Sequence, residues 1–140
     1  MNQTPNWLVE KQITLPNGEE ALWSYDTESD FLEVFFGKGP ATATIELADG
    51  VYLRFNRQKR EPLSIGFLGV TPLTLQQEFG LPLLSLDGLH NLPDTEQQVI
   101  LNMLQTTPLN TIFTLYSFHP PSHTQAIPLA CFAQPLLLAA

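Results

Sequence analysis

A strict alternation of apolar and polar residues is the feature that most constrains how this chain can fold. Between residues 41 and 47, Ala, Ala, Ile and Leu alternate with Thr, Thr and Glu. A period of two places successive side chains on opposite faces of a β-strand, with one face buried and the other in water. Similar stretches recur as far as residue 70, with short turns between them. The predicted strands are residues 8–15, 21–25, 31–36, 41–47, 51–55 and 63–68.

The turn residues between these stretches predict antiparallel pairing. Asn17 and Gly18 form the dipeptide that most favours a two-residue hairpin turn. Asp49 and Gly50 provide a second turn, in which glycine can adopt a positive φ. Consecutive hairpins of this kind predict an antiparallel β-meander over the first half of the chain.

The second half carries helix signals instead. Thr71 followed by Pro72 is typical of an N-cap with proline at the first helical position, and we expect that helix to end near Phe79. Asp94 begins a second predicted helix, and Gln97, three residues later, fits a start resembling a capping box. The spacing of apolar residues on this helix predicts a buried stripe. That stripe consists of Ile100, Met103 and Leu104.

Two further strand-like segments complete the predicted fold. Residues 110–118 are rich in Ile, Thr, Phe and Tyr. Residues 126–138 read as extended but contain proline, so we expect any strand there to lie at a sheet edge. Each half of the 140 residues is small for a core of its own. We therefore predict one α+β domain, in which a helix-containing extension (71–140) packs on the meander (1–70).

The basic residues are confined to one half of the chain. All six Lys and Arg residues lie within the first 60 positions, and none follows Arg60. So long a stretch without Lys or Arg indicates large covered areas. The predicted strand 31–36 also has a face that is not cleanly polar, with Phe31, Glu33 and Phe35 on it, so we expect either a second layer or a partner chain to cover that face. We infer a non-catalytic protein that acts through association, as a homo-oligomer or with a small protein partner, with Phe31 and Phe35 in the interface.

Charge and apolar content exclude several other partners. The net charge of −8 argues against nucleic acid and anionic membrane surfaces. A single cysteine, Cys131, cannot form an internal disulfide, and the first residues lack the features of a signal peptide. The most apolar stretch, residues 126–140, is shorter than the roughly 20 residues that span a bilayer. We therefore expect a cytoplasmic protein that does not insert into membranes.

Three stretches of the first half carry a family resemblance. They are residues 24–34 (Ser-Tyr-Asp-Thr-Glu-Ser-Asp-Phe-Leu-Glu-Val), residues 46–51 (Glu-Leu-Ala-Asp-Gly-Val) and the closing strand 63–68. Together they resemble the family called domain of unknown function 2283. The resemblance implies a small antiparallel meander, no enzymatic activity and, by association, an antitoxin-like pairing with a small toxin. Where that family often has an acidic turn with glycine, this chain has Asn-Arg-Gln-Lys-Arg at 56–60.

Asp26 and Asp30 bracket the turn between the second and third predicted strands. Aspartate side chains accept backbone N–H bonds in turns, so we predict a structural role for both. Together with Glu28 they also resemble the first ligands of an EF-hand calcium loop. That loop needs glycine at its sixth position and glutamate at its twelfth, where this chain has Phe31 and Gly37. An EF-hand is therefore excluded.

A basic segment lies between the fifth and sixth predicted strands. Four cations within seven residues could bind an anion such as phosphate. The alternative is a solvated loop that faces the acidic turn at residues 26–33. The four residues are Arg54, Arg57, Lys59 and Arg60.

The sequence predicts no catalytic residue, no cofactor and no metal site. His90, His119, His123 and Cys131 do not show metal-ligand spacing, because prolines separate the two closest histidines. The chain also has no nucleophile-elbow motif and no phosphate-binding glycine loop. The alternative function is a binder of small apolar ligands, or an enzyme, with a site between the two halves. Tyr116 and His119 are the polar candidates for such a site.

Overall fold

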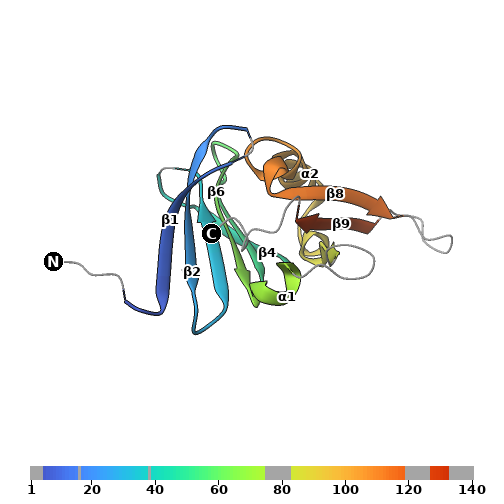
Figure 1. The fold of residues 1–140 in the computed structure, drawn as a ribbon. Helices are drawn as coiled ribbons and strands as arrows, with labels where there is room; N and C mark the ends of the chain where they lie inside the picture. The colour runs from blue at the N-terminus through green and yellow to red at the C-terminus, as the bar shows by residue number, and fades with distance from the viewer. Residues whose placement is uncertain (1–4, 16, 38, 75–82, 119–126, 133–140) are drawn as a thin grey trace.

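The computed structural model describes residues 5–15, 17–37, 39–74, 83–118 and 127–132 (Figure 1). Every strand predicted for the first half is present, with bounds that differ from the predicted ones by one or two residues. The strands are β1 (Leu8–Thr14), β2 (Glu20–Asp26), β3 (Phe31–Phe35), β4 (Ala43–Ala48), β5 (Val51–Asn56) and β6 (Glu61–Leu68).

These six strands form one antiparallel sheet in the order β1-β2-β3-β6-β5-β4. The sheet is two three-stranded meanders, β1 to β3 and β4 to β6, joined through the pair β3 and β6. This confirms the predicted antiparallel meander. Because β6 pairs with β3, the two strands with buried Leu32 and Phe67 lie at the centre of the sheet.

The second half adds short helices and a small sheet. Its helices are α1 (Val70–Thr74) and α2 (Asp94–Leu104), with 3₁₀ turns η1 (Asp87–Asn91) and η2 (Leu109–Thr111). Its strands β7 (Leu84–Ser85), β8 (Phe113–Phe118) and β9 (Ile127–Phe132) form a three-stranded sheet. The predicted α+β class is therefore confirmed.

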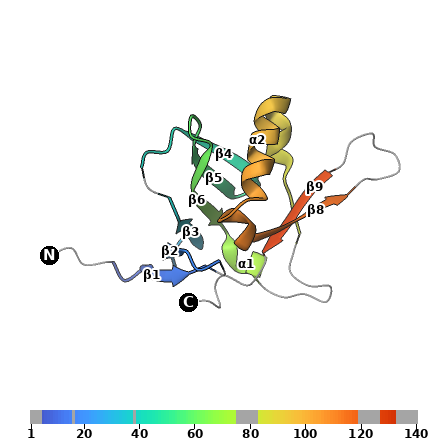
Figure 2. The same ribbon diagram turned by 90° about the horizontal axis from the view of Figure 1, so that it is seen from above.

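Helix α2 and the small sheet lie on the same side of the six-stranded sheet, as Figures 1 and 2 show. We call the sheet surface toward them the inner face. A row of fully buried side chains crosses it from β2 to β5 in register. The row consists of Trp23, Val34, Ile65 and Leu53. The ring of Phe67 meets the ring of Phe113 edge-on, with centroids 5.6 Å apart. One buried cluster thus joins residues of both halves of the chain.

Helix α2 begins at Asp94 and buries the predicted stripe of Ile100, Met103 and Leu104. Its start differs from a capping box in detail. Pro93 occupies the N-cap position and provides no side-chain hydrogen bond. The Gln97 side chain donates instead to the carbonyl of Leu92, at 2.8 Å.

The prediction that Thr71 caps the first helix is wrong. Helix α1 already includes Val70, and the N–H and hydroxyl groups of Thr71 both donate to the carboxylate of Asp30. The cap therefore comes from the β2–β3 turn, far away in the sequence, which no local pattern could reveal. The predicted end at Phe79 lies outside the described residues.

The prediction of an edge strand near the C-terminus is also wrong. Strand β9 lies in the middle of the small sheet, between β7 and β8. Its proline is tolerated because β7 pairs only with Leu129 and Ala130. Pro128 lies just outside this pairing, and its carbonyl accepts a hydrogen bond from the N–H of Leu86. Proline has no backbone N–H, and β7 does not pair with Pro128, so no hydrogen bond between β7 and β9 is missing there.

The strand predicted over residues 110–118 begins later than expected. Residues Leu109–Thr111 form η2, and β8 starts at Phe113. The side chains of Leu109 and Ile112 are fully buried there. The burial of these two residues in the core therefore favours a 3₁₀ turn over the extended backbone of a strand.

Candidate functional site

The face of the six-stranded sheet opposite α2, here called the outer face, carries an unusual number of apolar side chains. Cross-strand register places Leu22, Phe35, Ser64 and Arg54 in one row. The next row but one on this face places Asp26, Phe31 and Leu68 side by side, and Glu33 lies in the row between them. We call these apolar side chains, with the charged pair between them, the outer-face patch. It consists of Leu22, Phe31, Glu33, Phe35, Arg54 and Leu68.

A polar group lies at the centre of the outer-face patch. The hydroxyl of Ser64 donates to Oε2 of Glu33 at 2.7 Å, and a guanidinium nitrogen of Arg54 lies 3.5 Å from the same oxygen. The Glu33 side chain is only 17% exposed, whereas that of Arg54 is 46% exposed. The outer-face patch therefore contains a largely covered carboxylate beside a half-exposed guanidinium.

The ring of Phe31 packs closely against β6 at Gly66. A Cβ atom at Gly66 would lie 2.7 Å from Cζ of the Phe31 ring, so only glycine leaves room for the ring in this position. The close approach keeps Phe31 half-buried against its own sheet. Leu68, beside it, is half exposed.

No described helix or strand covers the outer face, because α2 and the small sheet all pack on the inner face (Figure 2). The sequence predicted that either a second layer or a partner covers Phe31 and Phe35. Within the described part of the chain, the second layer lies on the opposite side. The two phenylalanines are half-buried.

Asp26 organises the turn that borders the outer-face patch. Its Oδ1 accepts the backbone N–H groups of Glu28 and Ser29, at 2.9 and 3.1 Å. Hydrogen bonding from Ser29 lowers the pKa of Asp26, because it stabilises the ionised carboxylate.

Asp30 ties this turn to helix α1. Its carboxylate accepts the hydroxyls of Tyr25 and Thr71, each at 2.6 Å, and the N–H of Thr71 at 3.0 Å. Partial burial alone would raise the pKa of Asp30, but hydrogen bonds from Thr71 and Tyr25 outweigh it and lower the pKa. The same bond to Asp30 raises the pKa of Tyr25. Asp30 also has a φ of 55°, which aspartate tolerates better than most residues.

The tyrosine at the other end of the outer face is influenced by a carboxylate as well. Tyr52 lies opposite Glu46 across the β4–β5 pair. A hydrogen bond to Glu46, together with the negative charge of that group, raises the pKa of the Tyr52 phenol.

The structure separates the four cations of the basic segment. Arg54 lies on the outer face beside Glu33. Arg57 instead forms an ion pair with Glu96 of α2, with 3.3 Å between Nε and Oε1. Lys59 is exposed at the turn, where its N–H donates to the side chain of Asn56. The proposed anion-binding set is therefore not one cluster, and only Arg57 and Arg60 lie beside α2.

Glu96 is a partner that reasoning from the sequence missed. Only five acidic residues follow Arg60, and Glu96 is one of them. Glu96 shares the first turn of α2 with Asp94, and two acids there, in a half with few charges, are a signal for an ion pair with a basic loop. The sequence could not show that α2 lies over that loop.

The histidine and cysteine candidates form no centre in the described residues. His90 is exposed on η1, and Tyr116 is 52% exposed on β8. His119 and His123 lie outside the described residues, and the side chain of Cys131 is not described. Within the described ranges, no three His, Cys, Asp or Glu side chains are grouped to hold a metal. Nor does that part of the chain contain a helix long and apolar enough to cross a membrane.

The described residues thus define an α+β domain whose antiparallel sheet is covered by helices on one face only. Comparisons with family models, curated proteins and solved structures found no match to this chain.

Proposed function

We propose that this protein acts through association, not catalysis, and that it pairs with a second copy of itself through the outer-face patch. The observation that carries the proposal is the apolar content of a sheet face over which no described element packs. Leu68 is half exposed on this face and Phe31 and Phe35 are partly exposed, so a partner could cover apolar surface there. The resemblance to the domain of unknown function 2283 family supports the same class, since no enzymatic activity comes with that family.

The arrangement of charges favours a second copy as the partner. A two-fold interface uses the same patch on both subunits, so the patch must be complementary to itself. With a net charge of −8, two copies repel each other over most of their surface. In the outer-face patch, however, Glu33 lies beside Arg54, so each copy offers both signs of charge. Phe31, Phe35 and Leu68 would provide the apolar contacts of the interface around this charged pair.

We also propose that the protein works in the cytoplasm and that its partner is a protein and not a nucleic acid. A single cysteine is consistent with the reducing cytoplasm, where we place the protein. The net charge of −8 supports a protein partner over nucleic acid.

Replacing Phe35 with glutamate tests the proposed interface. We expect the wild-type protein at about 100 μM to sediment as a dimer, and Phe35→Glu to sediment as a monomer. Two buried carboxylates would face each other across the two-fold axis, next to Glu33, and would have no water to solvate them. Sedimentation velocity gives the mass directly, and circular dichroism shows whether the variant is folded.

Leu83→Glu is the matched control, because it places the same charge at another exposed apolar residue, 57% accessible and away from the outer-face patch. It should remain a dimer. A wild-type monomer at this concentration, or equal behaviour of the two variants, would overturn the proposal.

A further inference from the structure

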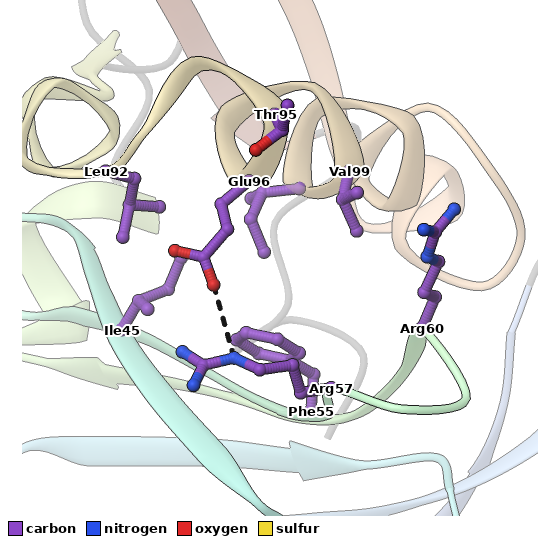
Figure 3. A pocket seen from close by; sticks show the side chains of 9 residues that line it. Ile45, Phe55, Arg57, Arg60, Leu92, Thr95, Glu96 and Val99 are labelled. Atoms are coloured by element: carbon purple, nitrogen blue, oxygen red, sulfur yellow. Dashed lines mark ion pairs between the residues drawn. The ribbon is translucent and has the colours of Figure 1, made fainter.

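A cavity of about 190 Å³ lies between helix α2 and the end of the β5–β6 hairpin. Its walls come from both halves of the chain, with Ile45 and Phe55 from the sheet and Val99 and Ile100 from the helix (Figure 3). An engineered apolar cavity of about 150 Å³ binds benzene, so this space can hold one aromatic ring or a short alkyl chain.

The entrance to the cavity is charged. Figure 3 shows the ion pair between Arg57 and Glu96 bridging the gap from the hairpin to the helix. Arg60 also lines the cavity, and it forms no ion pair with any described residue. Only six residues of the whole chain are Lys or Arg, and two of them line this one apolar space.

Arg60 also borders a second cavity of about 300 Å³. The two cavities share Arg60 and Val99, and the second is lined by apolar Pro62 and Met103 as well as by polar residues such as Glu61 and Asn102. Arg60 therefore stands at the edge of the first cavity, between the two spaces. A ligand with an apolar tail and an anionic head fits an apolar space with a cation at its edge.

We propose that this site binds a small amphipathic carboxylate, with its tail between Phe55 and Val99 and its carboxylate paired with Arg60. Arginine suits this role because its planar guanidinium offers two parallel N–H donors to a carboxylate. Glu96 competes for the same region, since its own carboxylate occupies Arg57 and repels an incoming anion. The proposal is independent of the outer-face patch, which lies on the other side of the sheet.

The test uses hexanoate and 1-hexanol, which have the same chain but different head groups. Each is titrated into the isotopically labelled full-length protein at low ionic strength, and amide shifts report the site and the dissociation constant. We expect hexanoate to bind more tightly than hexanol, with shifts at residues 55–60 and 92–100. Equal affinity, or no shifts in these segments at millimolar concentrations, would overturn the proposal.

Three variants test which charged side chains attract or repel the carboxylate of hexanoate. Arg60→Asn removes the guanidinium and suits the φ of 56° at this position, because asparagine tolerates positive φ. We expect it to weaken hexanoate binding by about three- to fivefold, the value of one exposed ion pair. Glu96→Gln removes the competing carboxylate and releases Arg57, so it should tighten binding by a similar factor.

Arg54→Asn is the matched control, because it removes a cation of the same basic segment from the opposite face of the sheet. Its hexanoate affinity should equal that of the wild type. Phe35→Glu should also bind hexanoate normally, which separates this proposal from the one on association. An unchanged affinity in Arg60→Asn, or weaker binding by Glu96→Gln, would overturn the assignment.

Discussion

Replacing Gly88 with alanine is expected to lower the free energy of unfolding by about 3 kcal/mol. Gly88 lies in η1, which packs directly against the backbone of the edge strand β4. A Cβ atom at this position would overlap the backbone carbonyl oxygen of Glu46. Backbone cannot rotate away as a side chain can, so η1 has to move. Its neighbours Leu86 and Leu89, both 1% exposed, would then lose their packing in the core.

Urea unfolding at 25 °C measures this loss, and Gly18→Ala is the matched control. No atom lies within 4 Å of a Cβ at Gly18, so that variant carries only the strain of a φ of 91°. We expect it to lose about 1 kcal/mol. If Gly88→Ala is no less stable than Gly18→Ala, then η1 does not contact β4 as closely as described.

Asp30→Ala is the second substitution with a large expected effect, a loss of about 2 kcal/mol of unfolding free energy. The carboxylate of Asp30 accepts two hydroxyl bonds and one N–H bond, from Tyr25 and Thr71. Alanine would lose all three and would also be strained at a φ of 55°. Asp30→Asn keeps the tolerance for positive φ and an amide oxygen, so it should lose less than half as much. An equal loss in both variants would show that the ionised carboxylate decides the effect, and not backbone strain or the number of hydrogen bonds.

The same carboxylate gives the protein a pH-dependent stability. The native pKa of Asp30 is lowered from 3.8, so the unfolded chain binds its proton more readily. The resulting stabilisation is present above the unfolded pKa and is lost as the pH falls through the lower native pKa. Urea unfolding from pH 6 down to pH 3 should therefore show a steeper decline in the wild type than in Asp30→Asn. Parallel curves for the two proteins would contradict this origin of the dependence.

The alternation of apolar and polar residues predicted the six-stranded sheet well, because a period of two is visible locally, although β6 buries both of its faces between Leu63 and Phe67. The apolar stripe on α2 was also predicted correctly, because the helical spacing of its residues is visible locally. The two clearest errors involve partners that are distant in sequence. Thr71 looked like a cap by its local pattern, but Asp30 provides the cap from another turn. Strand β9 looked like an edge because of Pro128, but β7 pairs only beyond the proline.

The candidate sites were predicted less completely than the fold. Phe31 and Phe35 were identified because they interrupt an otherwise regular alternation. The basic segment was identified by its charge density, but its residues point to different places, since Arg54 lies in a strand and Arg57 in a turn. Nothing in the sequence indicated that α2 passes over this turn and completes a cavity there.

The sequence by itself determined the secondary structure and the side of each strand that is buried, because these depend on periods of two and 3.6 residues that neighbouring residues establish. It also determined where the charges lie along the chain. Only the tertiary structure decided which face of the sheet the second half covers and which cations meet which acids. Those choices depend on how distant surfaces fit together, as where Gly88 allows η1 to reach β4 and where Asp30 holds α1 against the sheet.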